Sequence, residues 1–412
     1  MQRSSGFSEF AAAFNKLSSR SDDYVPEIVR TILQEARAGR ASDVHLVPSE
    51  SLLMMHWRVD GVLHAISGFD RELATRVIAR LKVMCGLLTY RTDVPQEGRV
   101  AREYSQTEVR VTTFPTLYGE KAAIRMFAEN DQLQRLSQLG LPSTVLSSLR
   151  NHLDATAGVI LLTGPSGSGK TTTAYACLRD IVEECHGGRC IMTLEDPIEV
   201  AVSGATQSQV RPSAGFDLAT GLRSLMRQDP DVILVGEIRD PQTAEAAFQA
   251  ALTGHLVLTT FHAGSAAEAI TRLLDMQIEP YLIRSGLRSV ICQRLLRKAC
   301  AACLNIDKSA EVVDEPAGSF LNQIDKTDAH ATRRNQCRSC GGTGYLGRLV
   351  LAEMLDPNQP EVARAVLEKT DAQQIAALAA AGGMQTLQQA ADQAVLEGLT
   401  TREEVLRVLG GR

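Results

Sequence analysis

Eight residues near the middle of the chain, Gly164-Pro165-Ser166-Gly167-Ser168-Gly169-Lys170-Thr171, constrain the fold more than any other segment. They fit the pattern G-x-x-x-x-G-K-[ST], a P-loop, in which glycines let the backbone wrap closely around phosphate groups. The preceding residues 158–163 are typical of a short buried strand, and a helical run continues from Thr172. A strand, a glycine turn and a helix N-terminus direct backbone N–H groups and the positive end of the helix dipole at an anion. The sequence therefore predicts a nucleotide-phosphate site.

The last two residues of this segment have separate expected roles. Lys170 is expected to reach the β- and γ-phosphates, and the Thr171 hydroxyl is expected to hold Mg²⁺. The residues predicted to contact the nucleotide are Gly164, Pro165, Ser166, Gly167, Ser168, Gly169, Lys170, Thr171 and Thr172. The sequence has no Leu-Ser-Gly-Gly-Gln run, and its Asn-Lys at positions 15 and 16 lacks the following aspartate of a guanine-reading motif. The missing Leu-Ser-Gly-Gly-Gln run argues against a transporter cassette, and the missing aspartate favours ATP over GTP.

Length, net charge and the distribution of apolar residues limit the classes of protein to which the chain can belong. The 412 residues are too many for one core, so two or three domains are expected. A net charge of −5 argues against a protein that coats nucleic acid. No apolar run approaches the roughly 18 residues of a membrane span, and the first residues lack the apolar core of a signal peptide. We therefore expect a cytoplasmic protein whose nine cysteines are reduced.

The order of expected elements divides the chain. Strands and helices mix without βαβ regularity before residue 130, which predicts an α+β domain, and they alternate from residue 158 onwards, which predicts a parallel α/β core. Expected helices are 25–38, 72–87 and 143–152; expected strands are 43–47, 52–59, 62–64, 108–114, 121–127, 159–163, 190–194, 232–235 and 256–260. The predicted domains are an N-terminal segment 1–22, an α+β domain 23–130, a linker and helix 131–155, the P-loop core 156–296, a cysteine-bearing insert 297–348 and a helical region 349–412.

Acidic residues follow two apolar strands downstream of the P-loop. Glu195 and Glu199 come after the strand that ends near residue 194, and Glu237 comes after the strand 232–235. Carboxylates at the carboxyl ends of parallel strands point into the ligand crevice, where Mg²⁺ and an attacking water need them. Solvated loop acids are the alternative interpretation.

Two histidines stand at the two ends of the apolar strand 256–260. His262 is at the carboxyl end, where ligands bind, and we expect it to sense the γ-phosphate or to relay between Glu237 and the nucleotide. His255 is at the other end, and a packing role is more expected for it than for His262.

Two C-x-x-C pairs predict a structural zinc site. Cys300 and Cys303 form the first pair, and Cys337 and Cys340 form the second, so that four thiolates could complete a tetrahedral Zn²⁺ shell. The spacer between the pairs exceeds the usual zinc-ribbon range, which predicts a loop-rich insert. Redox-active dithiols are the alternative, but neither pair has a thioredoxin-like βα context.

Taken together, these motifs resemble the secretion ATPase superfamily, in its branch of type II secretion and type IV pilus assembly ATPases. The resemblance spans about residues 25–412, and its motifs stand in the family's order: Ala41–His45, Arg58–Gly61, Pro115–Lys121, the P-loop, the aspartate box Glu195–Glu199, the Walker B motif Gly236–Asp240, and the histidine box from His255 to His262. It implies a RecA-like core behind a PAS-like domain, and a hexamer.

The resemblance also implies residue roles. Glu199 is the expected general base, with Glu195 as its rival, and Glu237 is expected to act on the Mg²⁺ side. Arginines of the N-terminal domain reach the phosphates in similar proteins, and the matching positions here are Arg99, Arg110 and Arg125. Arg223 and Arg227 also match the family pattern, while ordinary salt bridges remain the alternative for each arginine.

The cysteine pairs indicate a branch of the family, since assembly and export motors typically carry them and retraction motors typically do not. The expected function is a cytoplasmic ATP-hydrolysing motor that assembles a type II secretion pseudopilus or pilus-like filament, with ATP, Mg²⁺ and Zn²⁺ bound. An inner-membrane platform protein is the expected partner, membrane association is expected to be peripheral, and no direct contact with nucleic acid is expected. A nucleic-acid translocase or helicase, a retraction-type motor and a non-hydrolysing scaffold are the alternatives.

Membrane recruitment is left open by the sequence. Assembly-branch proteins often carry a further N-terminal domain, whereas here only residues 1–22 are expected to precede the PAS-like region. Recruitment is expected to use the zinc insert, that short segment or a direct contact with the platform protein.

Overall fold

The computed structural model describes Phe7, Phe14 and residues 24–105, 107–126, 135–303, 337 and 339–410. Within it the chain forms two compact units. Unit 1 comprises Met1–Glu129 and Arg297–Arg348, and unit 2 comprises Asn130–Leu296 and Leu349–Arg412. The whole spacer between the cysteine pairs, residues 304–336, lies outside the described residues, and so does the loop-rich insert predicted there. Of the predicted segment 1–22, only Phe7 and Phe14 are described.

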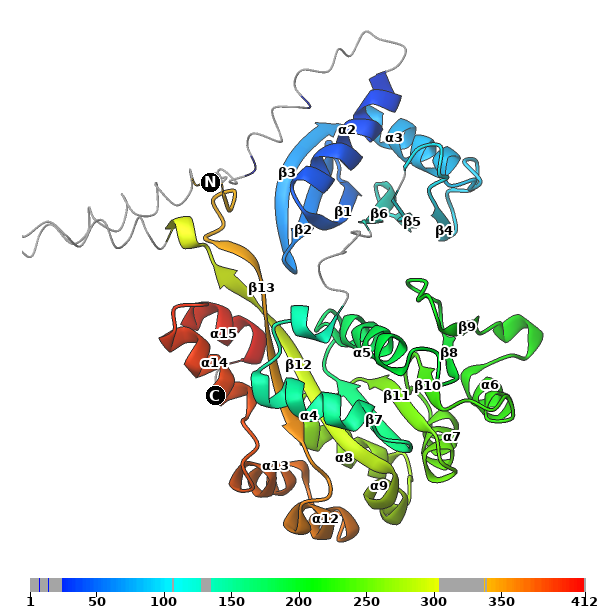
Figure 1. Ribbon diagram of the computed structural model, residues 1–412. Helices are drawn as coiled ribbons and strands as arrows, with labels where there is room; N and C mark the ends of the chain where they lie inside the picture. The colour runs from blue at the N-terminus through cyan, green and yellow to red at the C-terminus, as the bar shows by residue number, and fades with distance from the viewer. Residues whose placement is uncertain are drawn as a thin grey trace, which may run out of the picture. The chain divides into compact units, whose positions relative to one another are not determined.

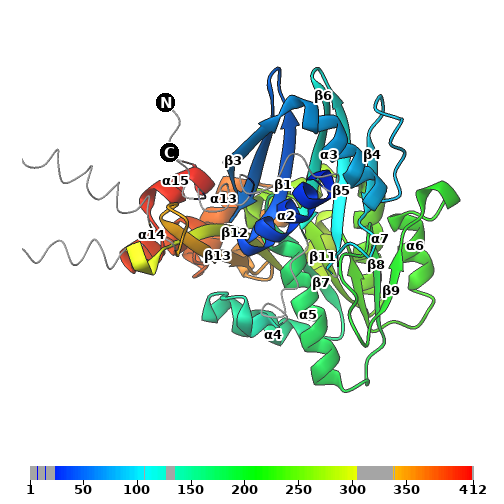
Figure 2. The same cartoon turned by 90° about the horizontal axis from the view of Figure 1, so that it is seen from above.

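Unit 1 is built on a six-stranded antiparallel sheet in the order β3-β2-β1-β6-β5-β4 (Figures 1 and 2). Two helices, α2 and α3, pack against each other and on the sheet. The elements are α2 (Tyr24–Ala38), β1 (Ala41–Pro48), β2 (Leu52–Val59), β3 (Val62–Asp70), α3 (Arg71–Met84), β4 (Gln96–Arg99), β5 (Val109–Thr116) and β6 (Gly119–Met126).

The hydrophobic pattern explains these elements. Apolar residues of α2 recur at helical spacing and are buried, while β1 and β2 alternate between buried and half-buried positions. Trp57 of β2 is fully buried at the centre of this core. The edge strand β4 has no counterpart in the prediction, because its sequence Gln-Glu-Gly-Arg carries no apolar alternation. Strand β3 continues to Asp70, well beyond the predicted 62–64.

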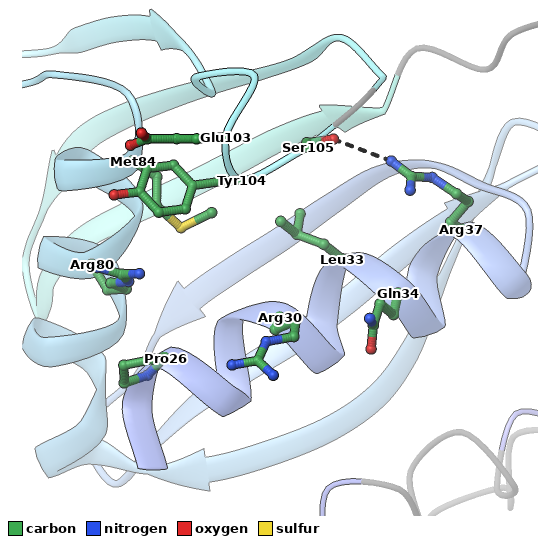
Figure 3. A pocket seen from close by; sticks show the side chains of 10 residues that line it. All are labelled: Pro26, Arg30, Leu33, Gln34, Arg37, Arg80, Met84, Glu103, Tyr104 and Ser105. Carbon is green, nitrogen blue, oxygen red and sulfur yellow. Dashed lines mark hydrogen bonds between the residues drawn. The ribbon is translucent and has the colours of Figure 1, made fainter. Parts of the chain in front are cut away.

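A groove of about 540 Å³ lies between α2 and α3 and is closed by the loop after β4 (Figure 3). Three arginines and one glutamate are among its lining residues, so the groove carries net positive charge. Arg37 donates hydrogen bonds to the side chains of Ser105, at 3.3 Å, and Thr107, which hold this loop. The guanidinium of Arg80 lies over the Tyr104 ring, 5.1 Å from its centroid.

Unit 2 contains a seven-stranded sheet in the order β13-β12-β7-β11-β10-β8-β9, and the pairs from β12 to β9 are parallel (Figure 1). Its first elements are η2 (Leu136–Gln138), α4 (Ser143–Leu153), β7 (Gly158–Thr163), α5 (Lys170–Cys185), β8 (Ile191–Glu195), β9 (Thr206–Gln209), η3 (Pro212–Ala214) and α6 (Leu218–Leu225). The rest are β10 (Val232–Val235), α7 (Pro241–Leu252), β11 (Leu256–Phe261), α8 (Ala266–Asp275), α9 (Pro280–Gly286), β12 (Leu287–Ala299), β13 (Tyr345–Leu355), α12 (Pro360–Leu367), α13 (Ala372–Ala381), α14 (Leu387–Leu396) and α15 (Arg402–Leu409).

Helices cover both faces of this sheet. Along β7, Val159 and Leu161 pack in the core that includes α7, α8 and α9, while Ile160 and Leu162 pack in the core that includes α4 and α5. The same alternation divides β10 and β11 between the two cores. Strands buried on both faces have continuous apolar sequences, which is why β7, β10 and β11 were predictable.

Strands β9, β12 and β13 were not predicted. Strand β9 is the polar tetrapeptide Thr-Gln-Ser-Gln at the sheet edge, and β12 mixes apolar residues with arginine and glutamine without a simple period. Four short helices follow β13 in the described part of the chain, and α13 is separated from α14 by a segment that includes Gly382-Gly383. Among the described helices, none is both long and apolar enough to cross a bilayer.

A buried ion pair in unit 1 makes a stability prediction. The Lys82 ammonium of α3 lies 2.5 Å from Glu120 of β6, and the two side chains are 0% and 8% exposed. Replacing Glu120 by Ala leaves a buried uncompensated charge, which costs about 3–5 kcal/mol, whereas the double variant Lys82→Met/Glu120→Leu costs much less. Calorimetry of the full chain should show a lower melting temperature for Glu120→Ala than for the double variant. Glu97→Ala, at an exposed position, serves as the control, and equal melting of all three variants would contradict the prediction.

Candidate nucleotide-binding site and cysteine cluster

The P-loop connects β7 to α5, and its glycines adopt positive φ angles. Gly164, Gly167 and Gly169 have φ angles of 141°, 77° and 95°, which other residues rarely adopt. A Cβ atom on Gly164 would lie 2.5 Å from the carbonyl oxygen of Gln293 on β12. The loop is therefore packed against β12, and a larger residue at position 164 cannot be accommodated without a backbone shift.

Lys170 is folded back into the loop that carries it. Its ammonium donates to the carbonyl oxygens of Gly164, at 2.9 Å, and of Pro165, at 3.0 Å. Burial lowers the pKa of Lys170, and the negative charge of Glu237 opposes that shift. The buried Ser168 hydroxyl has no hydrogen-bond partner among the described residues. A partly desolvated cation and a buried hydroxyl without a partner both suit a bound phosphate.

The acidic and histidine candidates gather at the carboxyl ends of neighbouring strands. Glu237 follows β10, and its carboxylate lies 3.4 Å from Nε2 of His262, which follows β11. Arg239 also contacts Glu237 and lies 4.0 Å from Asp196, which follows β8. The structure thus brings Glu237 and His262 together.

Glu195 and Glu199 lie in different environments. Glu195 is 4% exposed, and its two carboxylate oxygens accept hydrogen bonds from Tyr175, from Thr193 at 2.5 Å and from Gln207 at 3.1 Å. Glu199 is half-buried, four residues farther along the loop, and its backbone N–H donates to the Tyr175 hydroxyl at 3.1 Å. Glu195 is therefore fully engaged by protein donors within unit 2.

The remaining candidates of unit 2 lie next to β11, at the end of α6 and in the first turn of α5. His255 stands at the start of β11, where its Nδ1 contacts the carbonyl oxygen of Ala250 at 2.8 Å, as expected for a structural histidine. Arg223 and Arg227 are exposed at the end of α6, and Arg227 donates to the carbonyl oxygen of Arg223. Thr171 and Thr172 are exposed in the first turn of α5.

The N-terminal arginines form one row across the sheet of unit 1. Arg99 is paired in register with Arg110, Arg110 with Arg125, and Arg125 with Asp43. Register partners share one face of a sheet, so the three arginines project from the same side. Glu108 lies 3.3 Å from Arg99 and 3.2 Å from Arg110, and Asp43 lies 3.1 Å from Arg125. The row thus groups three residues that are 11 to 26 positions apart in the sequence.

The four predicted metal ligands converge. The sulfur atoms of Cys300, Cys303, Cys337 and Cys340 all lie within 4.8 Å of one another, with 4.0 Å between Cys300 and Cys337 and 3.7 Å between Cys303 and Cys340. Tetrahedral zinc with Zn–S bonds of about 2.3 Å separates its sulfurs by about 3.8 Å, so the cluster fits this ion. The backbone N–H of Gly344 donates to the Cys340 sulfur at 3.3 Å, a contact that supports a thiolate ligand.

Sequence reasoning missed several residues that shape the nucleotide site. Tyr175 and Gln207 bind the loop that carries Glu199, and the buried Gln293 of β12 donates to Thr173 of α5 at 3.0 Å. The positive charge of Arg294 lies close enough to contribute to the lowered pKa of Lys170. Gln293 and Arg294 lie on a strand that the prediction lacked, and Tyr175 and Gln207 carry no spacing signal that links them to the acidic loop.

Comparison with known proteins identifies the family. Residues 18–407 match the family described as type II/IV secretion system protein. The chain belongs to this family. Type II secretion system protein E of Pectobacterium carotovorum subsp. carotovorum is 40% identical over 392 residues, which cover 94% of this chain and 76% of that protein. The type IV pilus assembly ATPase PilB of Thermus thermophilus is 37% identical over 385 residues, which cover 92% of this chain and 42% of PilB.

Solved structures confirm the fold class. The ATPase DotB of Yersinia pseudotuberculosis has a TM-score of 0.67 at 20% identity, over 93% of each chain, and this likeness concerns the fold alone. The pilus retraction motor PilT with bound ADP has a TM-score of 0.58 at 25% identity, over 92% of this chain and 96% of PilT. The predicted RecA-like core with a PAS-like α+β domain, the predicted family and the predicted enzyme class, an ATP hydrolase, are thereby confirmed.

The cysteine cluster makes a prediction about metal content. Cys300→Ser removes one of four ligands, so we expect zinc to fall from about one ion per chain to a small fraction of that value, and the melting temperature to fall with it. Elemental analysis and calorimetry on the same sample measure both. Cys190→Ser, at an exposed cysteine outside the cluster, should change neither quantity. Unchanged zinc content in Cys300→Ser would show that the cluster is not the metal site.

Proposed function

We propose that this chain is a hexameric motor that hydrolyses ATP to assemble a type II secretion pseudopilus or a related pilus-like filament at an inner-membrane platform protein. The observation that carries the proposal is that one chain has both the four-cysteine cluster and a complete set of family ATPase motifs. The long matches to a type II secretion system protein E and to a type IV pilus assembly ATPase support it. In this proposal the protein is cytoplasmic and associates with the membrane only peripherally.

The P-loop holds ATP and Mg²⁺ in this proposal. Gly164 to Thr172 surround the phosphates, Lys170 exchanges its two loop carbonyls for phosphate oxygens, and the Thr171 hydroxyl binds Mg²⁺. Mg²⁺ held by Thr171 would supply positive charge that offsets the negative charge of the phosphate oxygens. Glu237 acts on the Mg²⁺ side, and its contact with His262 lets that histidine respond to the occupancy of the site.

Glu199 is the proposed general base, and Glu195 is not. Glu195 has hydrogen-bond donors on both carboxylate oxygens within a buried network, so its taking up a proton would break contacts that hold the loop. Glu199 lies on the loop beyond β8 and is more exposed than Glu195. A base must lie within hydrogen-bond reach of the proton it accepts, directly or through one water.

The arginine row supplies the proposed electrostatic contribution of the N-terminal domain. Arg99, Arg110 and Arg125 share one face of a sheet, so a rigid movement of that domain carries all three together. Arginine brought to a transferring phosphoryl group can accelerate the reaction by about 10³–10⁵-fold. A movement of the N-terminal domain that brings these arginines to the phosphates would then raise the rate of hydrolysis.

A retraction motor is the second candidate, since the PilT structure covers most of the chain. The cysteine cluster favours assembly, because the family resemblance implies that assembly motors typically carry such a cluster and retraction motors typically do not. The two candidates differ in a measurable way: expression of the protein should restore filaments in a strain that lacks its assembly motor, and should fail to restore retraction in a strain that lacks its retraction motor.

Lys170→Ala tests the nucleotide site. The variant loses the cation expected on the phosphates, so ATP turnover should fall at least about 100-fold while the melting temperature stays close to that of the wild type. Turnover by phosphate release and melting by calorimetry measure the two quantities. Lys369→Ala, at a position outside the site, should keep wild-type turnover. Wild-type turnover in Lys170→Ala would exclude the P-loop as the catalytic site.

A pair of substitutions tests the choice of base. Glu199→Gln should lower kcat by about 10²-fold or more and leave the melting temperature nearly unchanged, because the base is lost and the loop contacts remain. Glu195→Gln should lower the melting temperature, because an amide adds donors to a site that is already surrounded by donors. Full turnover in Glu199→Gln, with loss in Glu195→Gln at an unchanged melting temperature, would reverse the assignment.

A further inference from the structure

Tyr175 links the P-loop helix to the loop that carries Glu199. It lies on α5, five residues after Lys170, and is 4% exposed. Its hydroxyl donates to Glu195 at the end of β8 and accepts hydrogen bonds from the backbone N–H groups of Glu199, at 3.1 Å, and Val200, at 3.5 Å. One oxygen atom therefore joins three segments: α5, the end of β8 and the loop beyond it.

The protonation state of this hydroxyl is fixed. Burial raises the pKa of Tyr175, and the hydrogen bond and the negative charge of Glu195 raise it further, well above its usual value. The proton therefore remains on the tyrosine at neutral pH and points to Glu195, which leaves the lone pairs of the oxygen for the two backbone N–H groups. The direction of all three hydrogen bonds follows from this one proton.

Gln207 of β9 holds the same loop from the other side. Its amide nitrogen donates both to Glu195 and to the carbonyl oxygen of Val200, each at 3.1 Å, and its amide oxygen accepts the N–H of Val202 at 2.6 Å. Glu195 thus accepts hydrogen bonds from both Tyr175 and Gln207. The backbone on both sides of Glu199 and Val200 is fixed by these two side chains.

We propose that Tyr175 is a positioning residue for hydrolysis: through its hydroxyl, the helix that starts in the P-loop sets the place of Glu199. The inference rests on the proposed role of Glu199 as the base. Lys170, which is expected at the phosphates, and Tyr175 belong to the same helix, about one and a half turns apart. A shift of α5 when nucleotide binds or leaves would therefore move the loop of Glu199 with it.

Tyr175→Phe tests this inference, because it removes one oxygen and keeps the ring and its packing. A misplacement of about 1 Å can cost about 10²-fold in rate, so we expect kcat for ATP to fall about 10- to 100-fold. KM and the Kd for ATP, measured by calorimetric titration, should stay within about twofold, because no P-loop contact is changed. Tyr281→Phe, at an exposed tyrosine of the same unit, is the matched control and should keep wild-type kcat.

A double variant separates positioning from a general effect on the fold. In the Glu199→Gln background, Tyr175→Phe should cause little further loss of kcat, because the group that it positions is already gone. If Tyr175→Phe melts early, Gln207→Leu replaces it, since it frees the same loop from β9, and the same selective loss of kcat is expected.

Three outcomes would overturn the inference. Wild-type kcat in Tyr175→Phe, with loss in Glu199→Gln, would remove the positioning role and leave the base assignment intact. An equal fall in kcat and in ATP affinity would mean that the hydroxyl acts through the P-loop. Multiplying losses in the double variant would show that Tyr175 acts independently of Glu199. Full turnover in Glu199→Gln itself would instead overturn the proposed base, which distinguishes the two failures.

Discussion

Parallel hydrogen bonding joins β7 to β11, β11 to β10 and β10 to β8, and it brings the carboxyl ends of four strands to one edge of the sheet. Helices cover both faces, so charged residues are costly along these strands and first appear where the strands end. The P-loop, His262, Glu237 and Glu195 all occupy such ends. Their convergence therefore depends on the backbone ladder and on the two apolar cores rather than on contacts among the site residues themselves.

The same physics explains what the sequence could predict. Val159 to Thr163 and Val232 to Val235 are continuous apolar runs followed by glycine and charge, so both the strands and the residues at their ends could be recognised. The different environments of Glu195 and Glu199 could not be predicted from sequence, because they depend on Tyr175 and Gln207, which reach the loop from a helix and an edge strand. Hydrogen bonds between segments distant in sequence have no periodic signature.

The cysteine cluster shows a different limit. Each C-x-x-C pair is a local pattern, and the prediction of four joined ligands required only that the two pairs meet. They meet because one pair follows β12 and the other precedes β13, two strands that neighbour each other in the sheet. Neither strand was predicted, since β12 alternates irregularly between apolar and charged residues. The ligand set was thus predictable from chemistry, while the elements that bring it together depended on tertiary pairing.

The contacts of Lys170 indicate how nucleotide would act on this arrangement. Its ammonium is bound to two carbonyl oxygens of its own loop, and burial lowers its pKa while Glu237 opposes that shift. Phosphate oxygens would place negative charge near the ammonium, which favours its protonated form. An ammonium that binds phosphate would release the two carbonyl oxygens of the loop. Because Lys170 and Tyr175 belong to one helix, the exchange occurs at one end of the element whose other contacts hold the loop of Glu199. Under the proposed role of Glu199, binding energy at the phosphates would help to place the base, so that a motor of this kind would hydrolyse only correctly bound ATP.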